Sequence, residues 1–127
     1  MKKILICCLL FVLALVSDKT NGQSPKKELR HLVLFGWKSG ADSVAIQQAV
    51  AAFGQLKKQI NVIKHYEWGV NNSPEKLNQG LTHCFSLTFS SEKDRDDYLV
   101  HPAHIAFTKL LPNILDKVTV VDYWVNK

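Results

Sequence analysis

The sequence predicts a single α+β domain in which helices cover one face of a four-stranded antiparallel sheet. The chain has 127 residues, a length that fits one domain. Segments in which every second residue is apolar, as in strands, are interleaved with segments of helical spacing in the order β-α-β-β-α-β. This order is that of ferredoxin-like folds, and it accounts for residues 30–125.

Residues 1–22 are expected to lie outside the domain, because they have the three parts of a secretory signal peptide. Met1-Lys2-Lys3 is a charged start, Ile4 to Val16 is an apolar run, and the polar stretch that follows ends in Thr20-Asn21-Gly22. The apolar run is shorter than the ~20 residues that span a bilayer. We therefore expect cleavage before Gln23, export to the periplasm or the cell exterior, and no membrane partner afterwards.

The mature chain offers few classes of partner. Loss of three lysines and one aspartate with residues 1–22 lowers the net charge from +5 to +3. Acidic and basic residues are interspersed, so the sequence shows no nucleic-acid footprint. Cys84 is the one cysteine left, which excludes an internal disulfide and a cysteine-based zinc site. Residues 23–29 are polar and contain Pro25, as expected of a flexible lead-in.

The first predicted strand, residues 30–37, is apolar on both faces, which indicates that both faces are covered. Its two faces carry His31, Val33, Phe35 and Trp37, and Leu32, Leu34 and Gly36. A helix follows from Asp42 or Ser43, either of which can cap it. The core-facing stripe of this helix is predicted to be Ile46, Val50, Phe53, Leu56 and Ile60.

The second and third predicted strands, residues 62–70 and 81–90, suggest a further layer beyond the sheet. In the second strand His65 and Glu67 share a face, as a solvated pair at a sheet edge or as two metal ligands. The third strand has an apolar row that includes His83, and an opposite row of small uncharged residues, Thr82, Cys84, Ser86, Thr88 and Ser90. Such an uncharged face predicts contact with the sheet of a second copy in a homodimer.

A broken helix is predicted before the last strand, which covers residues 118–125. An acidic segment with a capping box starts at Ser91, and Pro102 ends this helix and begins another. Tyr98 and His104 can face one another across the break, either as a proton-transfer pair or as a buried hydrogen bond between helices. His101 is expected to face outward or to brace the break.

Two further histidines, His31 and His83, stand in apolar rows, where a ring nitrogen needs a polar partner or a wet cavity. Each alone is either a hydrogen-bonded core residue or part of a site. Taken with Tyr98 and His104, they predict one pocket between the sheet and the helices. The apolar wall of this pocket is predicted to consist of Val33, Phe35, Phe53, Phe85, Leu87 and Phe107.

Five motifs in this order resemble the stress-responsive A/B barrel family, also called Dabb, over residues 30–125. They are Arg30-His31-Leu32-Val33-Leu34-Phe35, Glu67-Trp68-Gly69, Thr82-His83, Tyr98 with His101-Pro102-Ala103-His104, and Val121-Asp122-Tyr123. The resemblance implies a dimeric α/β barrel built from two such sheets. It also implies the acid–base roles of a polyketide cyclase in the family: His104 removes a proton next to a carbonyl, and Tyr98 donates to the enolate oxygen. No metal or cofactor is implied.

Three functions stay open at this point. The chain is a binding module for a small hydrophobic or carbonyl ligand with a stress-related role, or a cofactor-free enzyme with cyclase- or lyase-like chemistry. The third is a monooxygenase, either cofactor-independent or haem-handling with His104 as the candidate axial ligand. Phe53 and Leu81 stand where the cyclase has tyrosines, which predicts a drier pocket. Export also separates the chain from activated acyl substrates, which are made inside cells.

Overall fold

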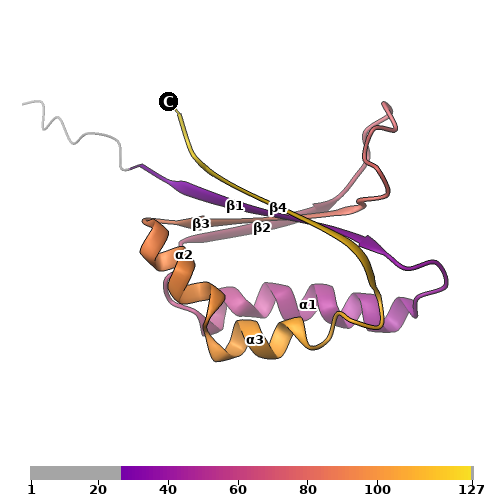
Figure 1. The fold of residues 1–127 in the computed structure, drawn as a ribbon, viewed down its shortest axis with the longest axis horizontal. Helices are drawn as coiled ribbons and strands as arrows, with labels where there is room; N and C mark the ends of the chain where they lie inside the picture. The colour runs from indigo at the N-terminus through magenta and orange to yellow at the C-terminus, as the bar shows by residue number, and fades with distance from the viewer. Residues whose placement is uncertain (1–26, 127) are drawn as a thin grey trace, which may run out of the picture.

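The computed structural model describes residues 27–126, which form one sheet and three helices (Figure 1). The elements in chain order are β1 (Leu29–Trp37), α1 (Ser43–Gln59), β2 (His65–Val70), β3 (His83–Phe89), α2 (Glu92–Leu99), α3 (Pro102–Thr108) and β4 (Leu115–Trp124). The strands are antiparallel in the order β2-β3-β1-β4, which confirms the predicted ferredoxin-like α+β fold. The predicted signal peptide and residues 23–26 lie outside the described residues, and Leu29, predicted to end the lead-in, begins β1 instead.

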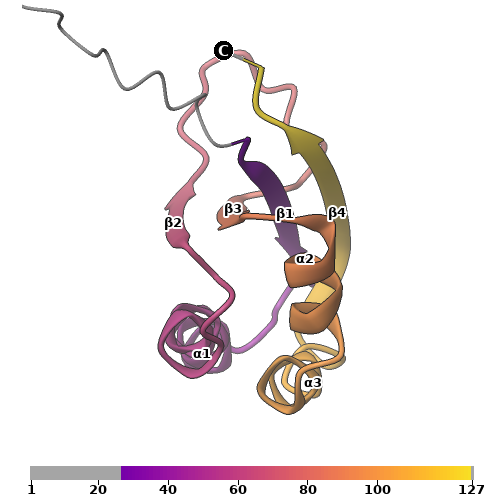
Figure 2. The same ribbon diagram turned by 90° about the vertical axis from the view of Figure 1, so that its left-hand side faces the viewer.

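All three helices lie on one side of the sheet, and the other side is open (Figures 1 and 2). In β1 the residues that point toward the helices are buried, whereas Leu32 and Leu34 on the open face are half-buried. No helix within residues 27–126 has the length and apolar character needed to cross a membrane.

α1 packs on the sheet through one buried stripe. Asp42 caps the helix by accepting a hydrogen bond from the Val44 amide at 3.0 Å, as a short acidic side chain does at this position. Ile46 and Val50, which the sequence pattern places in the stripe, are partly buried. Its fully buried positions are Ala49, Phe53 and Leu56.

The core between the helices and the sheet is a cluster of aromatic rings. Phe53 of α1 stacks on Phe85 of β3 with ring centroids 4.3 Å apart, and Phe107 of α3 meets Phe53 edge-on at 4.8 Å. Phe35 of β1 packs against all three rings. None of the four is more than 5% exposed, so burial of this cluster holds both α1 and α3 to the sheet.

The helix break lies where the sequence predicts it. Pro102 is in the first turn of α3, where its missing N–H removes no helical hydrogen bond. His101 caps α3 because its Nδ1 accepts a hydrogen bond from the Ala103 amide at 3.1 Å. His101 therefore braces the break.

Two strands begin at positions that hydrophobic alternation does not predict. β2 starts at His65 rather than at residue 62, because the Ile63 amide donates to the Ile60 carbonyl at 3.2 Å in a turn that buries Ile63 in the core. β4 starts at Leu115 rather than at residue 118, because its first residues still pair with the end of β1, across a shift in register after Gly36.

Candidate functional site

A cavity of about 350 Å³ lies between the sheet and α3 and opens along β4, where Val118 and Val120 are about half exposed. The strand register gives the cavity two different ends. His31 pairs with Asp122 in the first part of β1, and Phe35 pairs with Val118 four residues further along the strand. The lining residues are His31, Val33, Phe35, Phe53, Tyr98, Leu99, His104, Phe107, Thr108, Leu111, Leu115, Val118, Val120 and Asp122.

His104 meets Tyr98 at the polar end, with ring centroids 4.5 Å apart. His104 Nδ1 lies 3.0 Å from the Leu99 carbonyl oxygen, which can only accept, so Nδ1 carries the proton and Nε2 keeps its lone pair. Burial lowers the pKa of His104, against the opposing effect of this hydrogen bond. At neutral pH the ring is therefore an uncharged base.

Tyr98 lies between His104 and His31 and is 1% exposed. Burial raises the pKa of Tyr98 well above its ordinary value, so the phenol stays protonated at any physiological pH. A protonated phenol beside an uncharged imidazole is a donor next to an acceptor. The pair can hold a carbonyl group or move a proton.

His31 is held by a carboxylate on the neighbouring strand. Its Nδ1 donates to Asp122 Oδ1 at 2.6 Å, and the other carboxylate oxygen of Asp122 accepts from Arg95 of α2. The sequence pattern gave no role to Asp122 or Arg95. The alternation of the last strand places Asp122 on the helix side, but the register against β1, which sets it opposite His31, is a tertiary property.

The structure does not place His83, Phe85 and Leu87 on the wall of this cavity, so the single pocket predicted from the sequence is divided. His83 pairs with Phe35 near the far end of β1, and its Nδ1 accepts a hydrogen bond from Trp37 Nε1 at 3.0 Å. Burial lowers the pKa of His83, which keeps this ring an acceptor. Phe85 and Leu87 are fully buried in the core. His83 is thus a half-buried histidine whose Nδ1 has a partner, outside the cavity beside α3.

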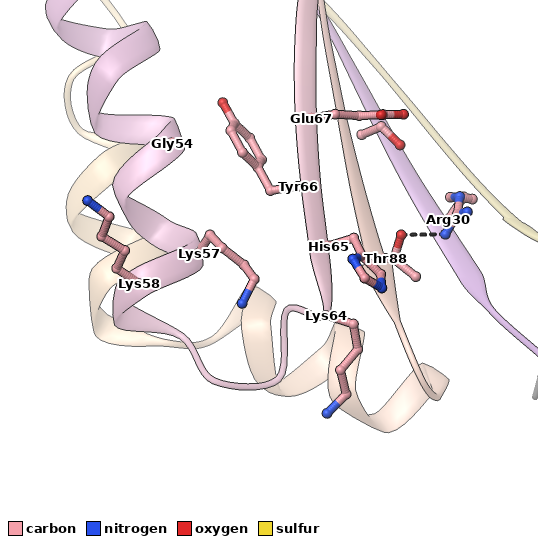
Figure 3. A pocket seen from close by; sticks show the side chains of 10 residues that line it. Arg30, Gly54, Lys57, Lys58, Lys64, His65, Tyr66, Glu67 and Thr88 are labelled. Atoms are coloured by element: carbon pink, nitrogen blue, oxygen red, sulfur yellow. Dashed lines mark hydrogen bonds between the residues drawn. The ribbon is translucent and has the colours of Figure 1, made fainter.

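A wider cleft of about 520 Å³ follows the edge strand β2 (Figure 3). Its basic side chains come from three elements and the turn before β2: Arg30, Lys57, Lys58, Lys64 and His65. The Tyr66 hydroxyl is buried without a partner among the described residues, and burial raises the pKa of Tyr66 to about 12. His65 and Glu67 are both exposed, and residues 27–126 hold no group of three side chains that could bind a metal ion. The cavity beside α3 is the stronger candidate because it brings Tyr98, His104 and His31 together.

Comparison with known proteins identifies one family. The model of the Stress responsive A/B Barrel Domain, Dabb, matches residues 29–125. The stress-response A/B barrel domain-containing protein HS1 of Arabidopsis thaliana is 35% identical over 101 residues, which are 80% of this chain and 93% of that protein. Olivetolic acid cyclase of Cannabis sativa is 25% identical over 95 residues, 75% of this chain and 94% of that protein.

Solved structures agree with the sequence comparison. Hydroxynitrile lyase from Passiflora edulis superposes with a TM-score of 0.75 at 28% identity, over 81% of this chain and 97% of that one. A dimeric protein of ferredoxin-like fold from Bacteroides fragilis gives a TM-score of 0.62 at 25% identity, over 76% of this chain and 94% of that one.

Proposed function

Because this chain belongs to the stress-responsive A/B barrel family, we propose that it uses the cavity beside α3 to bind a small apolar molecule that carries a carbonyl group. The single observation that carries this proposal is the polarity of the cavity along its length. Tyr98, His104 and His31 gather at one end, and Phe35 and Val118 lie at the other. A ligand with one polar group and an apolar body satisfies both ends.

The size of the cavity narrows the class of ligand. At about 350 Å³ it is near the small limit of ligand pockets, which hold ~300–1,000 Å³. Aromatic aldehydes and short-chain aldehydes or ketones fit this description. The Tyr98 hydroxyl would donate to the carbonyl oxygen, and the apolar body would lie against Phe107 and Val120.

Binding is tested with a defined probe and a cavity-filling variant. Benzaldehyde, followed by the fluorescence of the tryptophans or by ligand-observed NMR, is expected to bind the wild type. Val120→Trp, which fills the open side of the cavity, should abolish binding, whereas Val70→Trp on exposed β2 should not. Native mass spectrometry of freshly purified protein would also show a retained ligand. Equal binding by both variants would move the site away from this cavity.

A second function, cofactor-free acid–base catalysis, is favoured by the protonation states of one pair. His104 has an unprotonated Nε2 at neutral pH, and Tyr98 keeps its proton. His104 would remove a proton next to the carbonyl, and Tyr98 would donate to the oxygen on which negative charge develops. Two similar proteins are named as a lyase and a cyclase, which supports catalysis by this architecture.

Export and a homodimer complete the proposal. The charged start and apolar run before Ser17 support cleavage ahead of Gln23, and mass spectrometry of the N-terminus of protein from its native host tests it. An intact Met1 in the cytoplasm would rule export out. The uncovered sheet face, and the dimeric state of the similar protein from Bacteroides fragilis, support pairing of two copies through their sheets.

A further inference from the structure

We propose that Arg95 is a positioning residue of the site, which holds the Asp122 carboxylate so that His31 stays uncharged, with its proton on Nδ1 and a free lone pair on Nε2. The proposal rests on the proposed function in one respect, that the cavity lined by His31 is the ligand site. Its test requires no ligand.

The three side chains form a chain of contacts from the surface of α2 to the cavity. Arg95 donates through Nη1 to Asp122 Oδ2 and through Nε to Asp96 Oδ1, the second at 2.7 Å. Asp122 Oδ1 accepts from His31 Nδ1 at 2.6 Å. The side chains of Arg95 and Asp122 are 21% and 25% exposed, whereas that of His31 is 5% exposed.

The positive charge of Arg95 affects which protonation form of His31 the Asp122 carboxylate favours. A lone carboxylate at hydrogen-bond distance favours the charged imidazolium, because it gains a cation. Arg95 already supplies a cation that does not titrate in the physiological range. With one oxygen of Asp122 paired to the Arg95 cation, the other oxygen can accept the Nδ1–H of an uncharged His31 ring.

Within residues 27–126, the other side chains that pack on the His31 ring are uncharged. Tyr98 of α2 packs edge-on against the ring at 5.6 Å and is protonated. His104 of α3 is uncharged at neutral pH. β3 contributes Leu87, its register partner, and Phe89. The ion pair between Asp122 of β4 and Arg95 therefore sets the protonation state of the His31 ring.

The state of His31 matters because it acts on the base. Burial lowers the pKa of His104, the hydrogen bond to Leu99 opposes this, and the proximity of His31 lowers it further. This last effect belongs to the charged form of His31, which would weaken His104 as a proton acceptor. An uncharged His31 also presents an acceptor nitrogen where a charged ring would present a donor. Arg95 thus protects the basicity of a residue that it does not touch.

Ring nitrogen NMR on ¹⁵N-labelled protein without ligand tests the proposal. Long-range ¹H–¹⁵N spectra distinguish the Nδ1–H tautomer, the Nε2–H tautomer and the imidazolium of each histidine. We expect His31 of the wild type to be the Nδ1–H tautomer at neutral pH. In Arg95→Gln the imidazolium form should make up a larger share of the His31 signal at neutral pH than in the wild type. Arg95→Lys, which keeps the charge, should restore most of the wild-type behaviour.

A matched control separates positioning from simple attachment of α2 to β4. Trp124 Nε1 of β4 donates to Glu92 Oε1 of α2 at 3.3 Å, a second tie between the same elements. Glu92→Ala should lower the Tm without moving the His31 signals. If Arg95→Gln lowers the Tm in the same way and leaves the His31 signals unchanged, Arg95 only attaches α2 to β4 and the proposal is wrong. A charged His31 in the wild type at neutral pH would also overturn it, even if Arg95→Gln does not fold. Failure of benzaldehyde to bind, with the NMR result as expected, would refute the ligand site alone.

Discussion

Tyr98 and His104 have opposite protonation roles, with ring centroids 4.5 Å apart, and one substitution at each residue can separate those roles. Tyr98→Phe removes the hydroxyl donor, and His104→Gln removes the base while keeping a polar side chain. We expect each variant to lose turnover of any carbonyl substrate that the wild type converts. The double variant should be scarcely slower than either single variant, because the two groups act in one step. Steady-state rates on the same substrate for all four proteins provide the measurement.

His101 supplies the control for this pair. It caps α3 and does not line the cavity, so His101→Ala should keep its turnover while losing ~1 kcal/mol of stability. The catalytic interpretation fails if His101→Ala loses activity and His104→Gln does not. It also fails if Tyr98→Phe only lowers stability, by ~1 kcal/mol or more, and the wild type turns over no substrate. The chain would then be a binding protein.

Acid should destabilise the fold through two half-buried histidines. Burial lowers the pKa of His104 and of His83 below the ordinary histidine value of ~6.5. A group with a lowered folded-state pKa contributes stability above its unfolded pKa and loses that contribution as the pH falls through the folded-state pKa. We therefore expect the Tm to fall as the pH drops below the ordinary histidine value of ~6.5. Thermal melts of the wild type and of His104→Gln test this, and an equally steep fall in both would exclude His104 as a source.

At the scale of elements, the end of β1 depends on one close approach of backbone. A Cβ added at Gly36 would lie 2.6 Å from the Gly80 carbonyl oxygen in the loop before β3. Because backbone cannot move aside as a flexible side chain does, Gly36→Ala should destabilise the protein by ~1–3 kcal/mol. Gly69 of β2 has no such neighbour within 4 Å, and Gly69→Ala is the matched control. Denaturant unfolding of both variants gives the comparison. Equal stabilities would show that the loop shifts freely.

The elements also show what the sequence can and cannot predict. Hydrophobic alternation correctly assigns the faces of β1 and β3, since it reports which side of a strand meets the core. It does not report position along the sheet. His31 and His83 share one face, yet the antiparallel register sets His83 opposite Phe35 and sets Asp122 opposite His31. The Tyr98–His104 contact could be predicted, because both residues flank one proline and their separation is local.

At the scale of the whole molecule, one face of the sheet has no helix over it. On that face Cys84 is exposed, Ser86 and Leu32 are half-buried, and Val121 and Tyr123 are close to half exposed. These residues are apolar or small, Arg30 and Glu67 lie beside them on the same face, and stacked sheets approach to ~10 Å. The same face on a second copy of the chain can pack against it, which gives a symmetric dimer with an isologous interface.

Ser86→Arg tests this pairing, because it places a long charged side chain in the middle of the face. We expect the wild type to be a dimer at micromolar concentration in multi-angle light scattering, and Ser86→Arg to be a monomer or to unfold. Gln48→Arg adds the same side chain to the exposed side of α1 and should leave the dimer intact. Circular dichroism separates a folded monomer from an unfolded chain. A wild type that is monomeric at this concentration, or a Ser86→Arg variant that still dimerises, would show that the open face is not the interface.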